Sequence, residues 1–152
     1  MTKTDMNGEA YFAVASEADL ATQWPRLLAA KPDFIKTYLE HSEEFERRKD
    51  DPAYYGRRGL DPALLSSIVK RAHAAGLRVT THISTAADFR NAIAAGVDEI
   101  AHLPLARINA QDAETAAKKH VTVVTTTLSH RPTNGIADLD GIFRDDLALL
   151  RT

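Results

Sequence analysis

Three residues that could bind a metal ion occur in similar settings along the chain. Lys36 lies in Phe-Ile-Lys-Thr, His82 in Val-Thr-Thr-His and His102 in Glu-Ile-Ala-His, each at or near the end of a short β-prone run. In parallel α/β folds, reactive groups gather at the carboxyl ends of the strands. Neighbouring strands lie about 4.8 Å apart, so side chains at matched heights could converge on one ion or on a pair of ions.

The chemistry of these side chains indicates a divalent transition metal. Two imidazoles suit zinc, manganese, nickel or iron, and the chain has no cysteine that could serve as a ligand instead. A cationic lysine does not bind metal, whereas a lysine carboxylated by carbon dioxide is anionic and can bridge two ions. Carboxylation needs a neutral amine, which burial beside Phe34 and Tyr38 would favour. We therefore predict one or two divalent ions, zinc first, held by Lys36, His82 and His102.

The elements that must position these residues alternate between β-prone and alanine-rich stretches. Strands are predicted over residues 11–15, 34–39, 77–83, 99–103 and 121–128. Helices are predicted to follow four N-cap residues, Ser16, Asp61, Thr85 and Asn109. Three residues after the first and third of these, an aspartate (Asp19, Asp88) would complete a capping box. Pro25 is expected to kink or restart the first helix. Repeating strand–helix units imply a parallel sheet with right-handed crossovers.

Two architectures satisfy this order, a doubly wound sheet and part of a (βα)8 barrel. A full barrel usually needs about 250 residues, so the length of 152 residues alone would favour the doubly wound sheet. Ligand candidates at the ends of three successive strands favour the barrel instead. We predict a single α/β domain over residues 1–152, a partial TIM-like (βα)8 barrel with parallel strands and flanking helices. The long polar stretch 40–60 is predicted to be a βα loop on the face that carries the site.

Four stretches of the sequence carry a family resemblance: Asp33-Phe34-Ile35-Lys36, residues 72–79, Thr81-His82 and residues 95–102. They are similar to the middle of amidohydrolase-superfamily barrels, most closely to the imidazolonepropionase-like and prolidase-like branch. The resemblance runs from about residue 11 to residue 128 and would cover roughly strands three to seven. It implies that Lys36 is a carboxylated strand-four lysine that bridges two metal ions. It also implies that His82 and His102, on strands five and six, bind the second ion.

Two departures from the family pattern limit what the resemblance implies. The family's first strand carries a His-x-His pair, which this sequence does not contain. The eighth strand carries a metal-binding aspartate, and the chain ends at Thr152, before such a strand is expected. The remaining aspartates near this end fall in a predicted loop and helix and are not assigned to that role: Asp138, Asp140, Asp145 and Asp146. We expect an incomplete catalytic domain with weak activity, or none, by itself.

The resemblance and the residues together predict a metal-dependent hydrolase that cleaves a C–N bond in a small molecule, such as an amide, a cyclic amide or a dipeptide. Tyr38, Arg57 and His130 are candidates for substrate binding, and an arginine would suit a substrate carboxylate. An exposed loop that packs on its own scaffold explains Arg57 equally well. His73, in a predicted helix, is expected to be structural.

Two other functions stay open. The chain could be a non-catalytic half-barrel that folds by self-association, because an open parallel sheet leaves edges that need cover. That alternative predicts a homo-oligomer. Lys36 could instead be the Schiff-base nucleophile of a barrel aldolase or lyase, with the two histidines as acid and base and no metal.

The composition and charge limit the class of protein, its partners and its location. Hydrophobic residues make up 44% of the chain and charged residues 26%, as in a folded globular protein. The net charge of −2 gives no reason to expect nucleic acid or an anionic membrane as a partner. Residues 1–10 are polar, unlike a signal peptide, and no run approaches the roughly 18 apolar residues of a membrane span. A cytoplasmic location is therefore expected.

Overall fold

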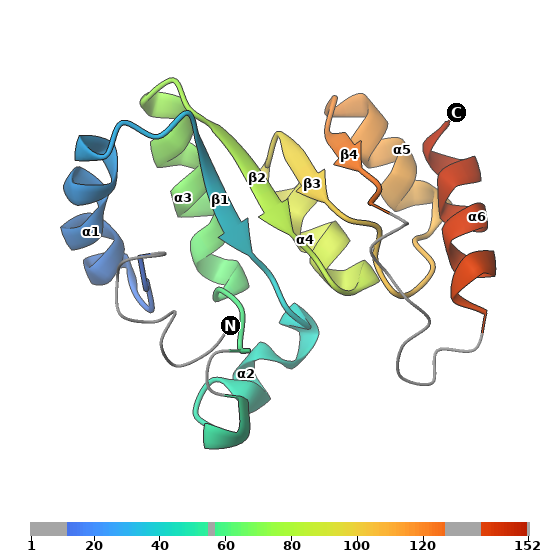
Figure 1. The fold of residues 1–152 in the computed structure, drawn as a ribbon, viewed down its shortest axis with the longest axis horizontal. Coiled ribbons are helices and arrows are strands. Elements are labelled where there is room, and N and C mark those ends of the chain that lie inside the picture. The colour runs from blue at the N-terminus through green and yellow to red at the C-terminus, as the bar shows by residue number, and fades with distance from the viewer. Residues whose placement is uncertain (1–11, 55–56, 127–137, 152) are drawn as a thin grey trace.

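A computed structural model describes residues 12–54, 57–126 and 138–151. Four parallel strands form one sheet in the order β1-β2-β3-β4 (Figure 1). They are β1 (Phe34–Tyr38), β2 (Arg78–His82), β3 (Glu99–Ala101) and β4 (Thr122–Val124). The longer helices of the described residues are α1 (Glu17–Ala29), α3 (Pro62–Ala74), α4 (Ala86–Ala95), α5 (Ala110–Lys118) and α6 (Leu139–Leu150). The predicted α/β class with parallel strands is confirmed.

The strand order distinguishes between the two architectures that the sequence left open. In a doubly wound sheet the strand order reverses partway across, and helices cover both faces. Here each strand lies next to the strand that precedes it in the chain, and Figure 1 shows α3, α4 and α5 behind the same face of the sheet. This singly wound arrangement is that of consecutive βα units in a (βα)8 barrel, as predicted.

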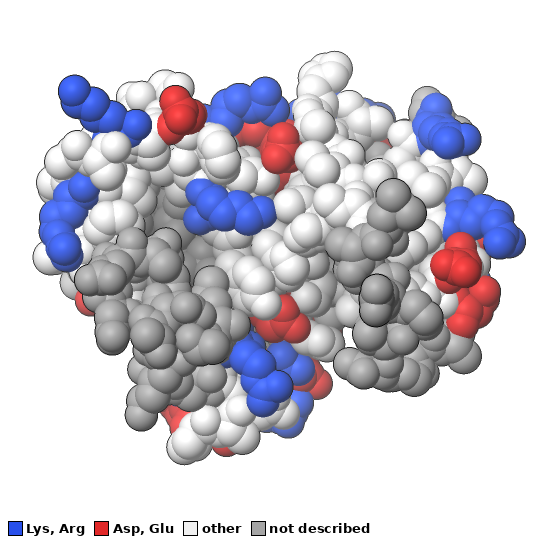
Figure 2. All heavy atoms as spheres, in the orientation of Figure 1, with Lys and Arg blue, Asp and Glu red and all other residues white. Residues whose placement is uncertain are grey.

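The two faces of the sheet differ in burial. Ile35, Val79 and Ile100 point towards the helices and are buried in the main hydrophobic core. Alternate residues along each strand point the other way, to a surface that we call the open face. The residues of the open face are Phe34, Lys36, Tyr38, Arg78, Thr80, His82, Glu99, Ala101, Thr122 and Val124. Figure 2 shows charged side chains of both signs interspersed over the molecule in this view.

Local sequence signals determine where the helices begin and end. The Asp61 carboxylate caps α3 by accepting from the N–H of Ala63 at 2.9 Å. Thr85 and Asp88 form the predicted capping box of α4, and Gly96 ends that helix with a φ of 87°. The apolar face predicted for α3 is buried: Leu64, Leu65, Ile68, Val69 and Ala72.

The strand predicted over residues 11–15 is wrong for the described residues 12–15, which belong to no strand. Their apolar side chains are covered in another way. The Arg26 guanidinium lies 5.7 Å from the ring centroid of Phe12, and Val14 packs against the hydrophobic core. These apolar residues are therefore explained by packing against a helix and the core, and not by pairing with the sheet.

The first helix also differs from its prediction. Ser16 caps α1 by accepting from the N–H of Asp19, but the Asp19 carboxylate accepts from the N–H of Ala15, so the capping box is not reciprocal. The restart predicted at Pro25 is wrong, because α1 is continuous around it.

Two further segments differ from their predictions: one strand is shorter, and one loop contains short helices. The run predicted as a strand over 121–128 is extended only to Val124, because Thr126 adopts a left-handed backbone with a φ of 42°. Residues 127–128 lie outside the described residues. The predicted loop 40–60 contains the short helices η2 (Ser42–Glu44), α2 (Phe45–Arg48) and η3 (Pro52–Tyr54). Of the helices described, none is long and apolar enough to cross a membrane.

Candidate functional site

Two histidine rings lie edge to face at the carboxyl ends of neighbouring strands. His82 is the last residue of β2, and His102 directly follows β3. Their ring centroids are 4.8 Å apart and their planes cross at 71°. His102 has a φ of 80°, which is uncommon for a residue with a side chain, and its N–H donates to the Val124 carbonyl at 2.7 Å. The structure thus brings two of the three predicted ligands together.

Burial keeps the His82 ring neutral. Desolvation, together with the nearby His102 and Lys36, lowers the pKa of His82 to about 4, while Glu40 and Asp88 act in the opposite direction. At neutral pH the ring therefore holds one proton and no charge. Its Nε2 lies 3.9 Å from Glu40 Oε2, but a neutral ring does not form an ion pair with that carboxylate. A neutral imidazole is the form that binds a metal ion.

The His102 ring is held by the strand that follows it. Its Nδ1 is hydrogen-bonded to the hydroxyl of Thr126, which comes just after β4. A histidine that ligates a metal commonly engages its second ring nitrogen in this way, which fixes the tautomer and the orientation of the ring. The contact with Thr126 is therefore one that a metal ligand would use.

Lys36 lies on the open face, two residues before Tyr38, which is the strand position that pairs with His82. The register pairs Lys36 with Thr80 and Thr80 with Glu99. The predicted burial of Lys36 is wrong: its side chain is exposed, because Phe34 beside it on the same face is itself 53% exposed. Partial desolvation still lowers the pKa of the amine, and the Glu99 carboxylate opposes that shift. The direction favours the neutral amine that carboxylation requires, and the exposure of the side chain limits the effect.

The three predicted substrate-binding residues have different positions. Tyr38 stacks on His82, with ring centroids 4.4 Å apart and planes within 11°. Arg57 is exposed and donates to the Ala53 carbonyl at 3.1 Å, a contact within its own loop that fits the alternative of a loop packed on its own scaffold. His130 lies outside the described residues. Of the two candidates that the structure describes, Tyr38 therefore lies beside His82 and Arg57 does not.

Other titratable residues that the sequence analysis set aside have structural contacts. His73 Nε2 lies 2.9 Å from Asp98 Oδ2, and the same oxygen accepts from the N–H of Val79 at 2.7 Å. These contacts tie α3 to β2, as expected for a structural histidine. Asp146 is fully buried in α6 and accepts from the N–H of Ile108 at 3.0 Å. Its burial raises the pKa of its carboxyl group.

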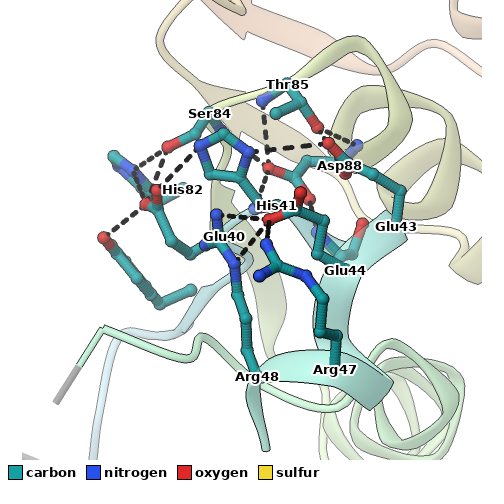
Figure 3. Close-up of polar contacts among 12 residues, drawn as sticks. Glu40, His41, Glu43, Glu44, Arg47, Arg48, His82, Ser84, Thr85 and Asp88 are labelled. Atoms are coloured by element: carbon teal, nitrogen blue, oxygen red, sulfur yellow. Dashed lines mark hydrogen bonds and ion pairs between the residues drawn. The ribbon is translucent and has the colours of Figure 1, made fainter. Parts of the chain in front are cut away.

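Glu40 is a member of this site that the sequence analysis missed. Its Oε2 accepts from the Tyr38 hydroxyl at 2.7 Å and from the Ser84 hydroxyl at 2.8 Å (Figure 3). Burial, followed by the bond to Glu40, raises the pKa of Tyr38 above its usual range. The available signal was the position of this carboxylate directly after the predicted strand. Leu39 extends the ladder by donating to the His82 carbonyl at 3.0 Å, so the strand carries Glu40 to the edge of the site.

Asp88 joins the two loops that border the site. Its fully buried carboxylate accepts from four backbone N–H groups, those of His41, Ser42, Ser84 and Thr85 (Figure 3). Burial opposes the ionisation of Asp88, but hydrogen bonds from residues of both loops outweigh it and lower the pKa. The sequence pattern indicated only the bond to Thr85, so the role of Asp88 in joining the loops was missed.

The donor set fits a metal ion only with a modified lysine. Among the described residues, no three His, Asp or Glu side chains are grouped so that they could hold an ion by themselves. His82 and His102 are adjacent, His82 is neutral, and each ring has one nitrogen engaged by a hydroxyl. Carboxylated Lys36 would supply the third, anionic ligand from the next strand.

Comparisons with known proteins support the fold. No protein-family model matches the chain, and no curated protein matches it. The chain is similar to a solved structure titled only as that of an uncharacterized protein, with a TM-score of 0.63 and 17% sequence identity. The match covers 91% of this chain and 36% of the other, so this chain spans about a third of the length of that protein. At this identity the similarity shows the fold alone: a parallel α/β unit that resembles part of a larger protein.

Proposed function

We propose that this chain is the metal-binding part of a metal-dependent hydrolase of the amidohydrolase type, which cleaves C–N bonds in small molecules. One observation carries the proposal. The neutral His82 ring and the His102 ring lie 4.8 Å apart at the carboxyl ends of two parallel strands. That edge is where parallel α/β enzymes place their reactive groups. The sequence resemblance to amidohydrolases assigns metal binding to the same two histidines and to Lys36.

Each of these residues has a part in the proposed site. His82 and His102 would hold the ion through neutral nitrogens, and carboxylated Lys36 would add a negative ligand. A bound divalent ion, zinc first, lowers the pKa of a water molecule and polarises a carbonyl group. Tyr38 stacks flat against His82 and so shields one side of that ring from water. Amides, cyclic amides and dipeptides are the substrate classes that we propose for the whole protein.

The lysine assignment has its own test. Zinc binding is measured by titration calorimetry with and without bicarbonate, in the wild type and in Lys36→Met. Lys118→Met is a matched control, because Lys118 is exposed and pairs with Glu114 on α5. We expect bicarbonate to strengthen binding in the wild type and in the control, and to have no effect in Lys36→Met. Binding that is independent of both bicarbonate and Lys36 would refute the carboxylated lysine.

Self-association is a second candidate, and the open face favours it. Among the described strands, β1 and β4 are the edges of the sheet, and such edges invite pairing. Phe34 on β1 is 53% exposed and Val124 on β4 is 40% exposed, so both edges carry uncovered apolar side chains. Sedimentation velocity over a range of concentrations tests this function. A dimer that Phe34→Glu dissociates would support it, whereas a monodisperse monomer at every concentration would contradict it.

A further inference from the structure

We propose that Glu40 and Ser84 are positioning residues that fix the tautomer and the orientation of the His82 ring. This inference rests on the proposed function of His82 as a metal ligand. The Ser84 hydroxyl lies between the two other groups, 2.8 Å from Glu40 Oε2 and 3.4 Å from His82 Nε2 (Figure 3). The three side chains come from the ends of β1 and β2, so the fold itself brings them together.

Counting protons determines the direction of these hydrogen bonds. A carboxylate only accepts, and a serine hydroxyl has one proton to give. Ser84 donates that proton to Glu40, which also accepts from Tyr38 at 2.7 Å. The Ser84 oxygen can then only accept from His82, so the ring proton lies on Nε2. The other ring nitrogen is left without a proton, which is the state that a metal ligand requires.

Two contacts restrict how the ring can turn. Tyr38 stacks on His82 at 4.4 Å with planes within 11°, which sets the plane of the ring. Within that plane, a flip of the ring would turn a C–H group towards Ser84 and would lose the hydrogen bond at Nε2. The stack and the hydrogen bond together select one orientation of the two that the plane permits.

Asp88 keeps the two ends of this chain of hydrogen bonds in place. It accepts from His41 at 3.1 Å and from Ser42 at 2.7 Å, directly after Glu40. On the other loop it accepts from Ser84 and from Thr85, both at 3.0 Å. Because one buried carboxylate binds both loops, the separation between Glu40 and Ser84 is set by the backbone. The positioning of His82 is therefore built before any metal binds.

The experiment reads the tautomer of His82 directly and then its metal affinity. Long-range 1H–15N spectra of the metal-free protein at pH 7.5 distinguish a protonated ring nitrogen from a bare one. We expect a proton on Nε2 in the wild type. Glu40→Met removes the oxygen that accepts from both Tyr38 and Ser84, which frees the Ser84 proton for Nε2. We therefore expect the ring proton to move towards Nδ1 and the zinc affinity to fall about ten- to hundredfold.

Matched variants separate positioning from a general disturbance of the loop. Glu43→Met makes the same chemical change three residues away, where the carboxylate accepts from Thr85 Oγ1 at 3.0 Å and lies 3.6 Å from His41 Nδ1. It should keep the wild-type tautomer and affinity. Ser84→Ala should lose the preference for Nε2, and Ser84→Thr should retain it because the hydroxyl is preserved.

The outcomes distinguish this inference from the proposed function. A wild-type tautomer and a zinc affinity within about twofold in Glu40→Met would overturn the positioning role, even if the protein binds zinc well. A wild type that binds no zinc, but whose His82 tautomer depends on Glu40 and Ser84 and not on Glu43, would support the positioning role and refute the metal proposal. A wild-type ring without a preferred Nε2 proton would also overturn the inference.

Discussion

Asp88→Asn is the substitution whose effect follows most directly from the structure. Asp88 Oδ2 accepts from His41, Ser84 and Thr85, and Oδ1 accepts from Ser42 at 2.7 Å. An asparagine keeps one acceptor oxygen and places an NH2 group where the other was. If the asparagine oxygen takes the Oδ2 position, the NH2 group takes the Oδ1 position and faces the N–H of Ser42. Two donors would then meet at a buried site.

The size of the effect follows from these four contacts. A buried donor left without a partner costs about 1–3 kcal/mol, and a hydrogen bond to a charged group is worth about 1.5–3 kcal/mol. The variant orphans one donor and removes the charge from three other bonds, which weakens each of them. We expect a loss of about 3 kcal/mol in the free energy of unfolding, a large share of the roughly 5–15 kcal/mol of an ordinary domain.

Urea unfolding followed by circular dichroism at pH 7 measures this loss. With a slope of about 2 kcal/mol per molar urea, the midpoint should fall by about 1.5 M. Asp112→Asn is the matched control, because Asp112 holds the same helix position in α5 but accepts from the side chains of Arg90 and Asn109 near the surface. That control should lose less than about 1 kcal/mol. Equal losses in the two variants would refute the reasoning.

The difference between wild type and Asp88→Asn should also depend on pH. The folded-state pKa of Asp88 is lowered, so its contribution to stability is present above the unfolded pKa of about 3.9 and is lost as pH falls through the lower folded value. The two unfolding curves should therefore approach each other below about pH 4. A difference that stays constant down to pH 2 would show that the charge of Asp88 is not what stabilises the loops.

Core packing, loop geometry and histidine ionisation each give one further test. Phe89→Ala removes a fully buried ring and should lower the free energy of unfolding by about 3–5 kcal/mol in urea titrations; a loss below 1 kcal/mol would contradict its place in the core. Gly59→Ala should cost about 1–3 kcal/mol and shift the amide resonance of Glu40, because Gly59 has a φ of 73° and an added Cβ would lie 2.7 Å from Glu40 N; an unchanged spectrum would count against that close approach. His82 should titrate with a pKa of about 4 by NMR, below its ordinary 6.5, so stability should fall as pH drops from 6.5 to 4 by up to about 3 kcal/mol. A pKa near 6.5, or the same pH dependence in His82→Gln, would contradict this account.

Features that depend on neighbouring residues could be predicted from the sequence. The caps at Asp61 and Thr85 and the helix end at Gly96 are local, so the start of α3 and both ends of α4 agreed with their patterns. The positions of His82 and His102 at strand ends were predictable for the same reason, because β-prone runs precede them. The parallel order of the sheet followed from the alternation of strands and helices.

Features that depend on distant residues could not be predicted. Asp88 accepts from His41 and Ser42, more than forty residues away in sequence, and no local pattern encodes that contact. The exposure of Lys36 depends on what covers the open face, which the strand pattern does not show. The left-handed backbone at His102, stabilised beside β4, likewise arises from tertiary contacts.

The most direct test of the central claim is the number of zinc ions that each chain retains. Protein prepared with bicarbonate and zinc is desalted, and its metal is measured by plasma mass spectrometry. We expect roughly one ion per chain, lost in His82→Ala and in His102→Ala. It should be retained in His73→Ala, because His73 pairs with Asp98, which lies just before β3 at the amino ends of the strands. A folded wild type without metal, or retention that does not depend on His82, would contradict the proposed metal site.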